Sequence, residues 1–147
     1  MEFETAVKLH IYDTLARTGR APATFETAAA LKAPVARVEE AYGGLHRKRL
    51  LVPEPGDPSR IRMAPPFSGV PTAFRVRVGA LRYHANCAWD ALGIPAALHR
   101  DAVVEAEDGS SGEPMRLLVE GAGPRPEPCV IHFAVPAARW WEDIIHT

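Results

Sequence analysis

The N-terminal third of the sequence has the apolar spacing of short α-helices. At its start, apolar residues recur every fourth position with polar residues between them, and the run RTGRAP then supplies glycine and proline as a stop. These apolar residues are Phe3, Val7, Ile11 and Leu15. The pattern predicts a first helix over about residues 2–17, a second helix that Thr24 caps before FETAAALK, and a third whose first turn contains Pro34.

The stretch LLVPEPGDPSRIRM, which follows the third predicted helix, has apolar-rich ends around a turn of Pro, Gly and Asp. This composition predicts a β-hairpin. Three helices followed by a hairpin are the layout of a winged helix. We therefore expect a winged-helix-like three-helix lobe over residues 1–65.

From Phe74 onward the period changes to alternation, with Val76 and Val78 set against two arginines, which predicts a half-buried strand. DAVVEAED and PMRLLVEG flank GSSGE as a predicted antiparallel hairpin, and CVIHFAVP (129–136) reads as a further strand. A short C-terminal helix is expected to begin at Pro136. It would bury some of Trp140, Trp141, Ile144 and Ile145. The predicted fold class is α+β, with a small mixed or antiparallel sheet and short helices over residues 66–147.

Composition narrows the class of protein. Of the 147 residues, 47% are hydrophobic and 24% charged, which allows both a core and solubility. Lys plus Arg total 17 against 18 Asp plus Glu, so no overall field attracts nucleic acid or an anionic membrane. No run approaches the ~18 to 20 apolar residues of a membrane span, and the acidic start MEFETAVKLH lacks a signal-peptide apolar region. We expect a cytoplasmic protein whose two cysteines, Cys87 and Cys129, remain thiols.

The stretch YHANCAWDALGIPAAL places the Cys87 thiol three residues before the Asp90 carboxylate, just after a predicted strand. Asn86 is expected to cap a helix that begins at Cys87. The helix dipole then favours the thiolate and an ionised Asp90 opposes it, so the two groups compete for one proton. A thiolate that binds a soft electrophile or metal leaves that proton on Asp90, which can act as a general acid on the same ligand. The structural alternative is a buried cysteine that behaves as a small hydrophobe, beside an aspartate that complements the dipole.

The residues around this pair resemble the alkylmercury (organomercurial) lyases. The similarity runs through PTAFRVRVGALRYHANCAWDAL, resumes at His132 and Phe133 in CVIHFAVP, and extends to Trp141. The resemblance implies a mechanism in which two cysteine thiolates hold mercury while an aspartate passes a proton to the leaving carbon. It assigns Cys87 as the first thiolate and Asp90 as the acid/base, with no cofactor and with mercury(II) or another soft metal as a substrate-derived ligand.

The second thiolate is where this sequence departs from the family. The family typically has a Cys-Cys doublet before its His-x-His-Phe stretch, and the first cysteine is the working ligand. Here Cys129 matches the second member and Pro128 stands at the first. On a strand this one-residue offset aims Cys129 away from Cys87, unless a bulge near the prolines turns it back. With one sulfur, the implied cleavage is expected to be slow or absent.

Two other functions fit the sequence. One is a thiol-dependent enzyme that uses Cys87 and Asp90 on a small organic substrate and needs no second cysteine. The other is a winged-helix regulator that senses a metal or small ligand, although Glu39 and Glu40 on its candidate recognition helix oppose contact with phosphates. We therefore expect a small-molecule substrate rather than a nucleic-acid or membrane partner, and the sequence leaves the oligomeric state open.

Overall fold

The structure is a computed structural model that describes residues 2–121 and 123–146. Three helices open the chain, as predicted: α1 (Phe3–Thr18), α2 (Thr24–Leu31) and α3 (Val35–Arg47). The expected cap of α2 is wrong by one residue, because Ala23 is the N-cap and Thr24 is the first helical residue, fully buried. The Glu26 carboxylate accepts a hydrogen bond from the Ala23 N–H at 2.8 Å, so a side chain of the first turn satisfies the helix start instead. Pro34 is the N-cap of α3 and not a residue of its first turn.

A small antiparallel sheet follows the helices. Strands β1 (Val52–Glu54) and β2 (Asp57–Ala64) form the predicted hairpin, and β3 (Phe67–Ser68) pairs with the other edge of β2. Because β3 lies beyond residue 65, this first sheet draws residues from both sides of the predicted lobe boundary. The division into two lobes stays a prediction.

The second sheet has five strands in the order β5-β4-β6-β7-β8, and each neighbouring pair is antiparallel. The strands are β4 (Arg75–Val78), β5 (Leu81–His84), β6 (Ala102–Glu107), β7 (Pro114–Glu120) and β8 (Gly123–Pro124). Val76 and Val78 are buried while Arg75 and Arg77, which alternate with them, are exposed, which is the alternation that the sequence predicts. Helix α4 (Ala88–Leu98) connects β5 to β6 and packs against β4 and β6. The α+β fold class is therefore confirmed.

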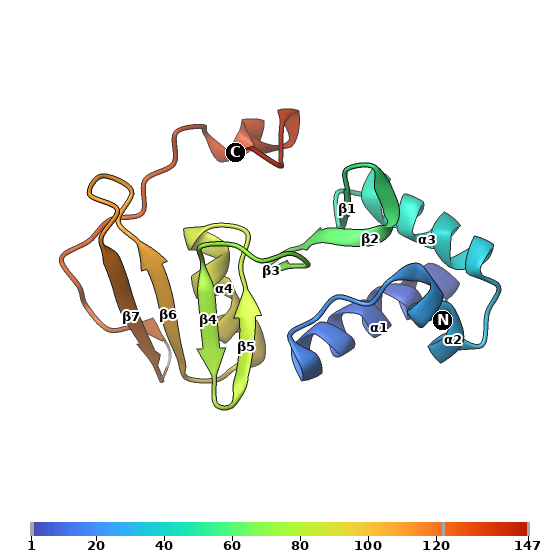
Figure 1. The fold of residues 1–147 in the computed structure, drawn as a ribbon, viewed down its shortest axis with the longest axis horizontal. Coiled ribbons are helices and arrows are strands. Elements are labelled where there is room, and N and C mark those ends of the chain that lie inside the picture. The colour runs from blue at the N-terminus through green and yellow to red at the C-terminus, as the bar shows by residue number, and fades with distance from the viewer. Residues whose placement is uncertain (1, 122, 147) are drawn as a thin grey trace.

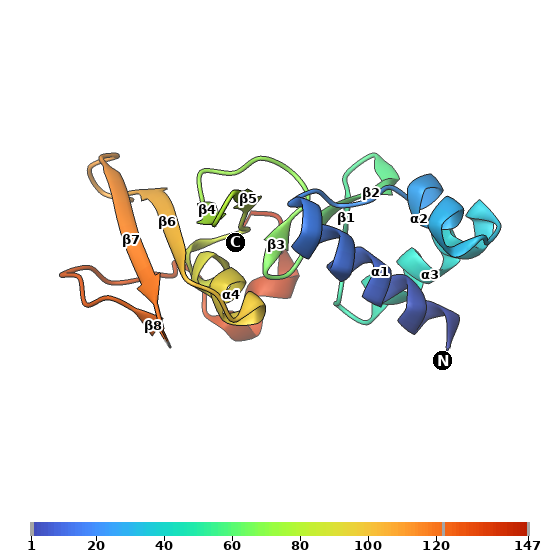
Figure 2. The same cartoon turned by 90° about the horizontal axis from the view of Figure 1, so that it is seen from below.

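The two sheets and the helices share one continuous core. The Phe67 ring lies 6.4 Å from the Tyr12 ring of α1 and 5.5 Å from the Tyr83 ring of β5, measured between centroids. The Tyr83 hydroxyl donates to the Ala16 carbonyl at 2.6 Å, in the last turn of α1. Helix carbonyls there have no partner within the helix, so this bond ties the end of α1 to β5. Figures 1 and 2 show the resulting elongated molecule, with α1–α3 at one end, β6 and β7 at the other and α4 between them.

The C-terminal segment does not form the predicted strand. Residues 129–136 have no strand pairing, and Val130 is 90% exposed. Alternating prolines before this stretch remove backbone donors that a ladder needs, and β8 is only two residues long. After Pro136 the chain forms a 3₁₀ helix, η1 (Ala137–Glu142), where a helix was expected.

Trp141 of η1 contacts the N-terminal part of the chain, and Trp140 packs within the C-terminal segment itself. Trp140 packs against Phe133 at 5.1 Å between ring centroids, and the Arg49 guanidinium lies 5.7 Å from the centre of the Trp141 ring. Both tryptophans are half-buried, as are Ile144 and Ile145, so the predicted burial is partial. Among the described residues, no helix is both long and apolar enough to cross a bilayer.

Candidate functional site

Cys87 occupies the N-cap of α4, one position before the place that the sequence predicts. Its backbone is extended, with φ −155° and ψ −179°, because the extended chain of β5 continues through a bridge between Ala85 and Phe67. Asp90 is the third residue of the helix. Side chains at the N-cap and third helical positions face each other across the first turn. The thiol and the carboxyl therefore share the start of α4.

Asn86 is not the cap. Its side-chain Nδ2 donates to Asp90 Oδ2 at 2.8 Å and to the Phe67 carbonyl at 3.2 Å. Because α4 begins one residue later than expected, Asn86 precedes the N-cap, and its amide donates to one acceptor on β3 and one on α4.

Burial raises the pKa of the half-buried Cys87 thiol. The backbone N–H groups of Asp90 and Trp89 act in the opposite direction, although the sulfur makes no cap hydrogen bond, and the Asp90 charge adds to the rise. The N–H groups at the helix start therefore lower the pKa of the Cys87 thiol by less than burial raises it. In the free protein at neutral pH, Cys87 keeps its proton.

Burial also raises the pKa of Asp90, and the hydrogen bond from Asn86 opposes that rise. Tyr12 on α1 is close enough to Asp90 to interact with its charge. Burial is the main cause that raises the pKa of the Tyr12 phenol, and the negative charge of Asp90 is the second cause. The Tyr12 hydroxyl donates to the Pro65 carbonyl at 3.0 Å. Sequence reasoning missed Tyr12, because only the packing of α1 beside β3 brings it near α4 and no local motif marks it.

Cys129 lies in the irregular C-terminal segment and is exposed, and neither cysteine forms a disulfide. Its assignment as the second thiolate stays a prediction. Within residues 2–121 and 123–146, no group of three or more His, Cys, Asp or Glu side chains is arranged to hold a metal ion. A mercury ion shared by two sulfurs would need fewer ligands than that.

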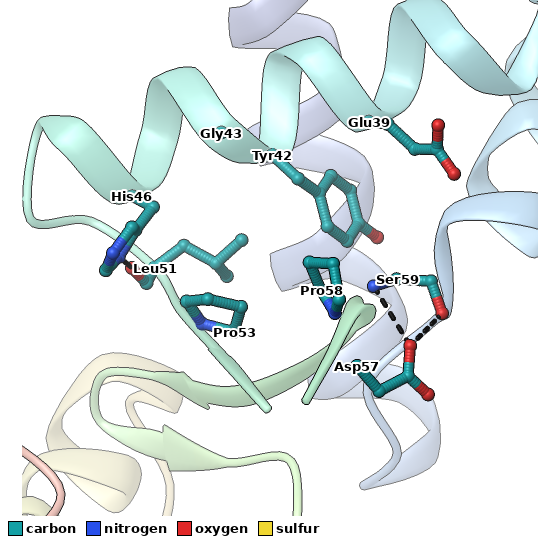
Figure 3. Close-up of a pocket in the computed structure, with 9 residues that line it drawn as sticks. All are labelled: Glu39, Tyr42, Gly43, His46, Leu51, Pro53, Asp57, Pro58 and Ser59. Atoms are coloured by element: carbon teal, nitrogen blue, oxygen red, sulfur yellow. Dashed lines mark hydrogen bonds between the residues drawn. The ribbon is translucent and has the colours of Figure 1, made fainter. Parts of the chain in front are cut away.

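A cavity of about 460 Å³ lies away from this pair, between α3 and the β1–β2 hairpin (Figure 3). Tyr42 and His46 of the helix face Pro53 and Pro58 of the hairpin across it. None of the predicted site residues, Cys87, Asp90 and Cys129, lines this cavity.

Comparison with known proteins decides the family. A sequence model of the alkylmercury lyase family, MerB, matches residues 67–147, which is more than half of the chain. The chain belongs to the alkylmercury lyase family. The expected resemblance is thus confirmed, and the family region includes β3, α4 with Cys87 and Asp90, and η1.

The fold agrees with this family assignment. The crystal structure of the mercury-bound form of MerB2 is similar with a TM-score of 0.67 at 20% sequence identity, over 86% of this chain and 60% of that chain. The present chain therefore spans about three fifths of the length of the chain in that structure. No protein with a curated description matches.

Proposed function

We propose that this member of the alkylmercury lyase family cleaves a carbon–mercury bond by protonolysis, with Cys87 as the mercury-binding thiolate and Asp90 as the proton donor. The observation that carries the proposal is the start of α4, where a half-buried thiol at the N-cap faces a half-buried carboxyl at the third helical position. We place the reaction in the cytoplasm, where thiols stay reduced.

The proposed reaction begins when an organomercurial cation binds the Cys87 sulfur and displaces its proton. Asp90 accepts this proton, because burial makes its carboxyl a stronger base than an exposed aspartate. The carbon–mercury bond then breaks, and its electron pair takes the proton from Asp90. The hydrocarbon leaves, mercury(II) stays on sulfur, and Asp90 returns to its ionised form.

Cys129 is the proposed second thiolate. The segment that contains it forms no β-ladder, so it can approach α4 without breaking sheet hydrogen bonds. A second sulfur donates electron density to mercury and makes the attached carbon easier to protonate. We expect that a free thiol in solution partly replaces Cys129.

The test is benzene release from phenylmercury in the presence of excess thiol. Cys87→Ser and Asp90→Asn should abolish release, and Cys129→Ser should reduce it with partial recovery at higher thiol concentration. Asp13→Asn is the matched control for the loss of a carboxylate, since Asp13 pairs with Arg17 on the exposed face of α1. Release by Cys87→Ser at the wild-type rate, or no release by the wild-type protein, would remove the proposal.

The exposure of Cys129 favours one second candidate, in which Cys87 acts alone. In that case Asp90 takes the thiol proton as the Cys87 sulfur attacks a small organic electrophile, and it then passes that proton to the adduct, with no metal. Incubation with such electrophiles in the absence of mercury, followed by mass spectrometry, should then show a covalent adduct on Cys87. An adduct of equal yield in Asp90→Asn would show that the carboxyl takes no part.

A further inference from the structure

The Asn86 amide lies between β3 and α4 and can adopt only one orientation. Both groups within reach of its Nδ2 are hydrogen-bond acceptors: Asp90 Oδ2 at 2.8 Å and the Phe67 carbonyl at 3.2 Å. A flipped amide would place oxygen against the Phe67 carbonyl oxygen, which cannot donate. The NH₂ group therefore joins the site carboxyl to the neighbouring strand.

The other end of the same amide is unsatisfied. Asn86 Oδ1 is buried and, among the described residues, has no hydrogen-bond partner. A buried carbonyl without a donor destabilises a fold, so an apolar residue of similar size would suit this position better if packing were all that mattered. A function of the NH₂ group at Asp90 would explain why an asparagine with an unsatisfied oxygen stands at this position.

We propose that Asn86 is a positioning residue that holds Oδ2 of Asp90, so that Oδ1 of Asp90 carries the proton delivered to the leaving carbon. This inference rests on the proposed function. Since Asn86 Nδ2 already donates to Oδ2, the proton taken from Cys87 resides on the opposite oxygen. Because the amide is also bonded to β3, the carboxyl cannot rotate freely about its last bond.

The same hydrogen bond assists the transfer itself. As the proton moves from Asp90 Oδ1 to carbon and the carbon–mercury bond breaks, negative charge returns to the carboxylate. A hydrogen bond to an ionised acceptor is stronger than one to a neutral acid, so the Asn86 amide binds the transition state better than the protonated state before it.

The variant that tests this proposal is Asn86→Leu, which keeps the branching and the number of side-chain heavy atoms and removes both the donor and the unsatisfied oxygen. We expect kcat for benzene release to fall about 100-fold, the loss that a small displacement of a catalytic group produces. KM and the binding of phenylmercury to Cys87 should stay close to wild type. Loss of the two hydrogen bonds should lower the midpoint of urea unfolding, so kcat is measured under conditions in which circular dichroism shows Asn86→Leu to be fully folded.

Thr14→Val is the matched control, because Thr14 Oγ1 on α1 is another buried side-chain oxygen without a partner in the described structure. It removes an unpartnered buried oxygen without breaking a hydrogen bond to Asp90, and it should leave kcat unchanged. Wild-type kcat in Asn86→Leu, or a loss of kcat that follows a loss of folded protein, would overturn the proposal.

A readout independent of lyase activity separates this inference from the proposed function. The Asn86 side-chain NH₂ resonances, assigned by their loss in Asn86→Leu, should shift and exchange faster with solvent in Asp90→Ala. If the wild-type protein releases no benzene, the proposed function fails while these resonances still decide whether Asn86 holds Asp90. If they do not move in Asp90→Ala, the positioning role is refuted.

Discussion

Gly19 sits where α1 meets β5, and its replacement by alanine should weaken that junction. Gly19 ends α1 in the left-handed conformation, with φ +70°, and donates to the Leu15 carbonyl. A Cβ atom built on it would lie 2.2 Å from the backbone oxygen of Arg82. Only a glycine allows the end of the helix and the strand to come this close.

Two costs follow for Gly19→Ala. A left-handed backbone costs an alanine about 1–2 kcal/mol. The clash joins a Cβ atom, whose position the backbone fixes, to the Arg82 backbone oxygen, so no side-chain rotation relieves it, and it adds about 1–3 kcal/mol as overpacking does in a core. The total of roughly 2–5 kcal/mol is a large share of the 5–15 kcal/mol that stabilises a typical domain.

Urea unfolding followed by circular dichroism measures this cost, and Gly56→Ala separates its two parts. Gly56, in the β1–β2 turn, has φ +80°, and a Cβ there would meet nothing within 4 Å. Gly56→Ala therefore carries only the backbone cost. The smaller entropy of the unfolded chain helps both variants equally and cancels in the comparison.

We expect Gly19→Ala to be less stable than Gly56→Ala by about 1–3 kcal/mol, which is the clash alone. Equal stabilities for the two variants, within about 0.5 kcal/mol, would refute the close approach of α1 to β5.

Two further predictions concern the dependence of stability on pH. Burial raises the pKa of Asp90 above its usual 3.8, so the stability that Asp90 contributes is present below pH 3.8 and is lost as the pH rises through the raised pKa. Asp90→Asn should therefore be more stable than wild type at neutral pH. In urea titrations this difference in stability should close toward pH 3.5. The hydrogen bond from the Arg20 guanidinium, and after it the one from the Ala23 N–H, lowers the pKa of Glu26 to about 2. Glu26 therefore contributes stability above pH 4.5 that is lost as the pH falls toward 2. Glu26→Gln should be less stable than wild type at neutral pH and equal to it near pH 2. The difference in stability should be smaller in high salt, because the Arg20–Glu26 ion pair is exposed. A difference that persists in acid would contradict the assignment of this stability to the Glu26 carboxylate.

Sequence periodicity predicted the elements whose pattern is local. The four-residue spacing from Phe3 to Leu15 located α1, and the alternation around Val76 located β4, because each pattern records which face of one element is buried. The same reasoning failed for residues 129–136, where alternating residues have no neighbouring strand to pair with. Alternation predicts a strand only if a ladder partner exists, and the sequence of one segment does not contain that information.

The candidate site was predicted in part for the same reason. The Cys87 and Asp90 spacing is a property of one helix start, so it could be read from the sequence. The interactions that distinguish the site depend on tertiary packing: Asn86 bonds to β3, and Tyr12 approaches from α1. A capping preference made Asn86 the expected N-cap, but the acceptors that redirect its amide come from elsewhere in the fold.

The irregular path of residues 129–136 also affects how this family member can change in evolution. Inserting or deleting one residue in a paired strand sends every later side chain to the opposite face and breaks its ladder. No ladder constrains this stretch, so a cysteine can move from position 129 to position 128, or a doublet can arise there, without a cost to the core. The fold therefore sets the position of Cys87 at the start of α4, whereas no sheet pairing fixes where a second sulfur stands.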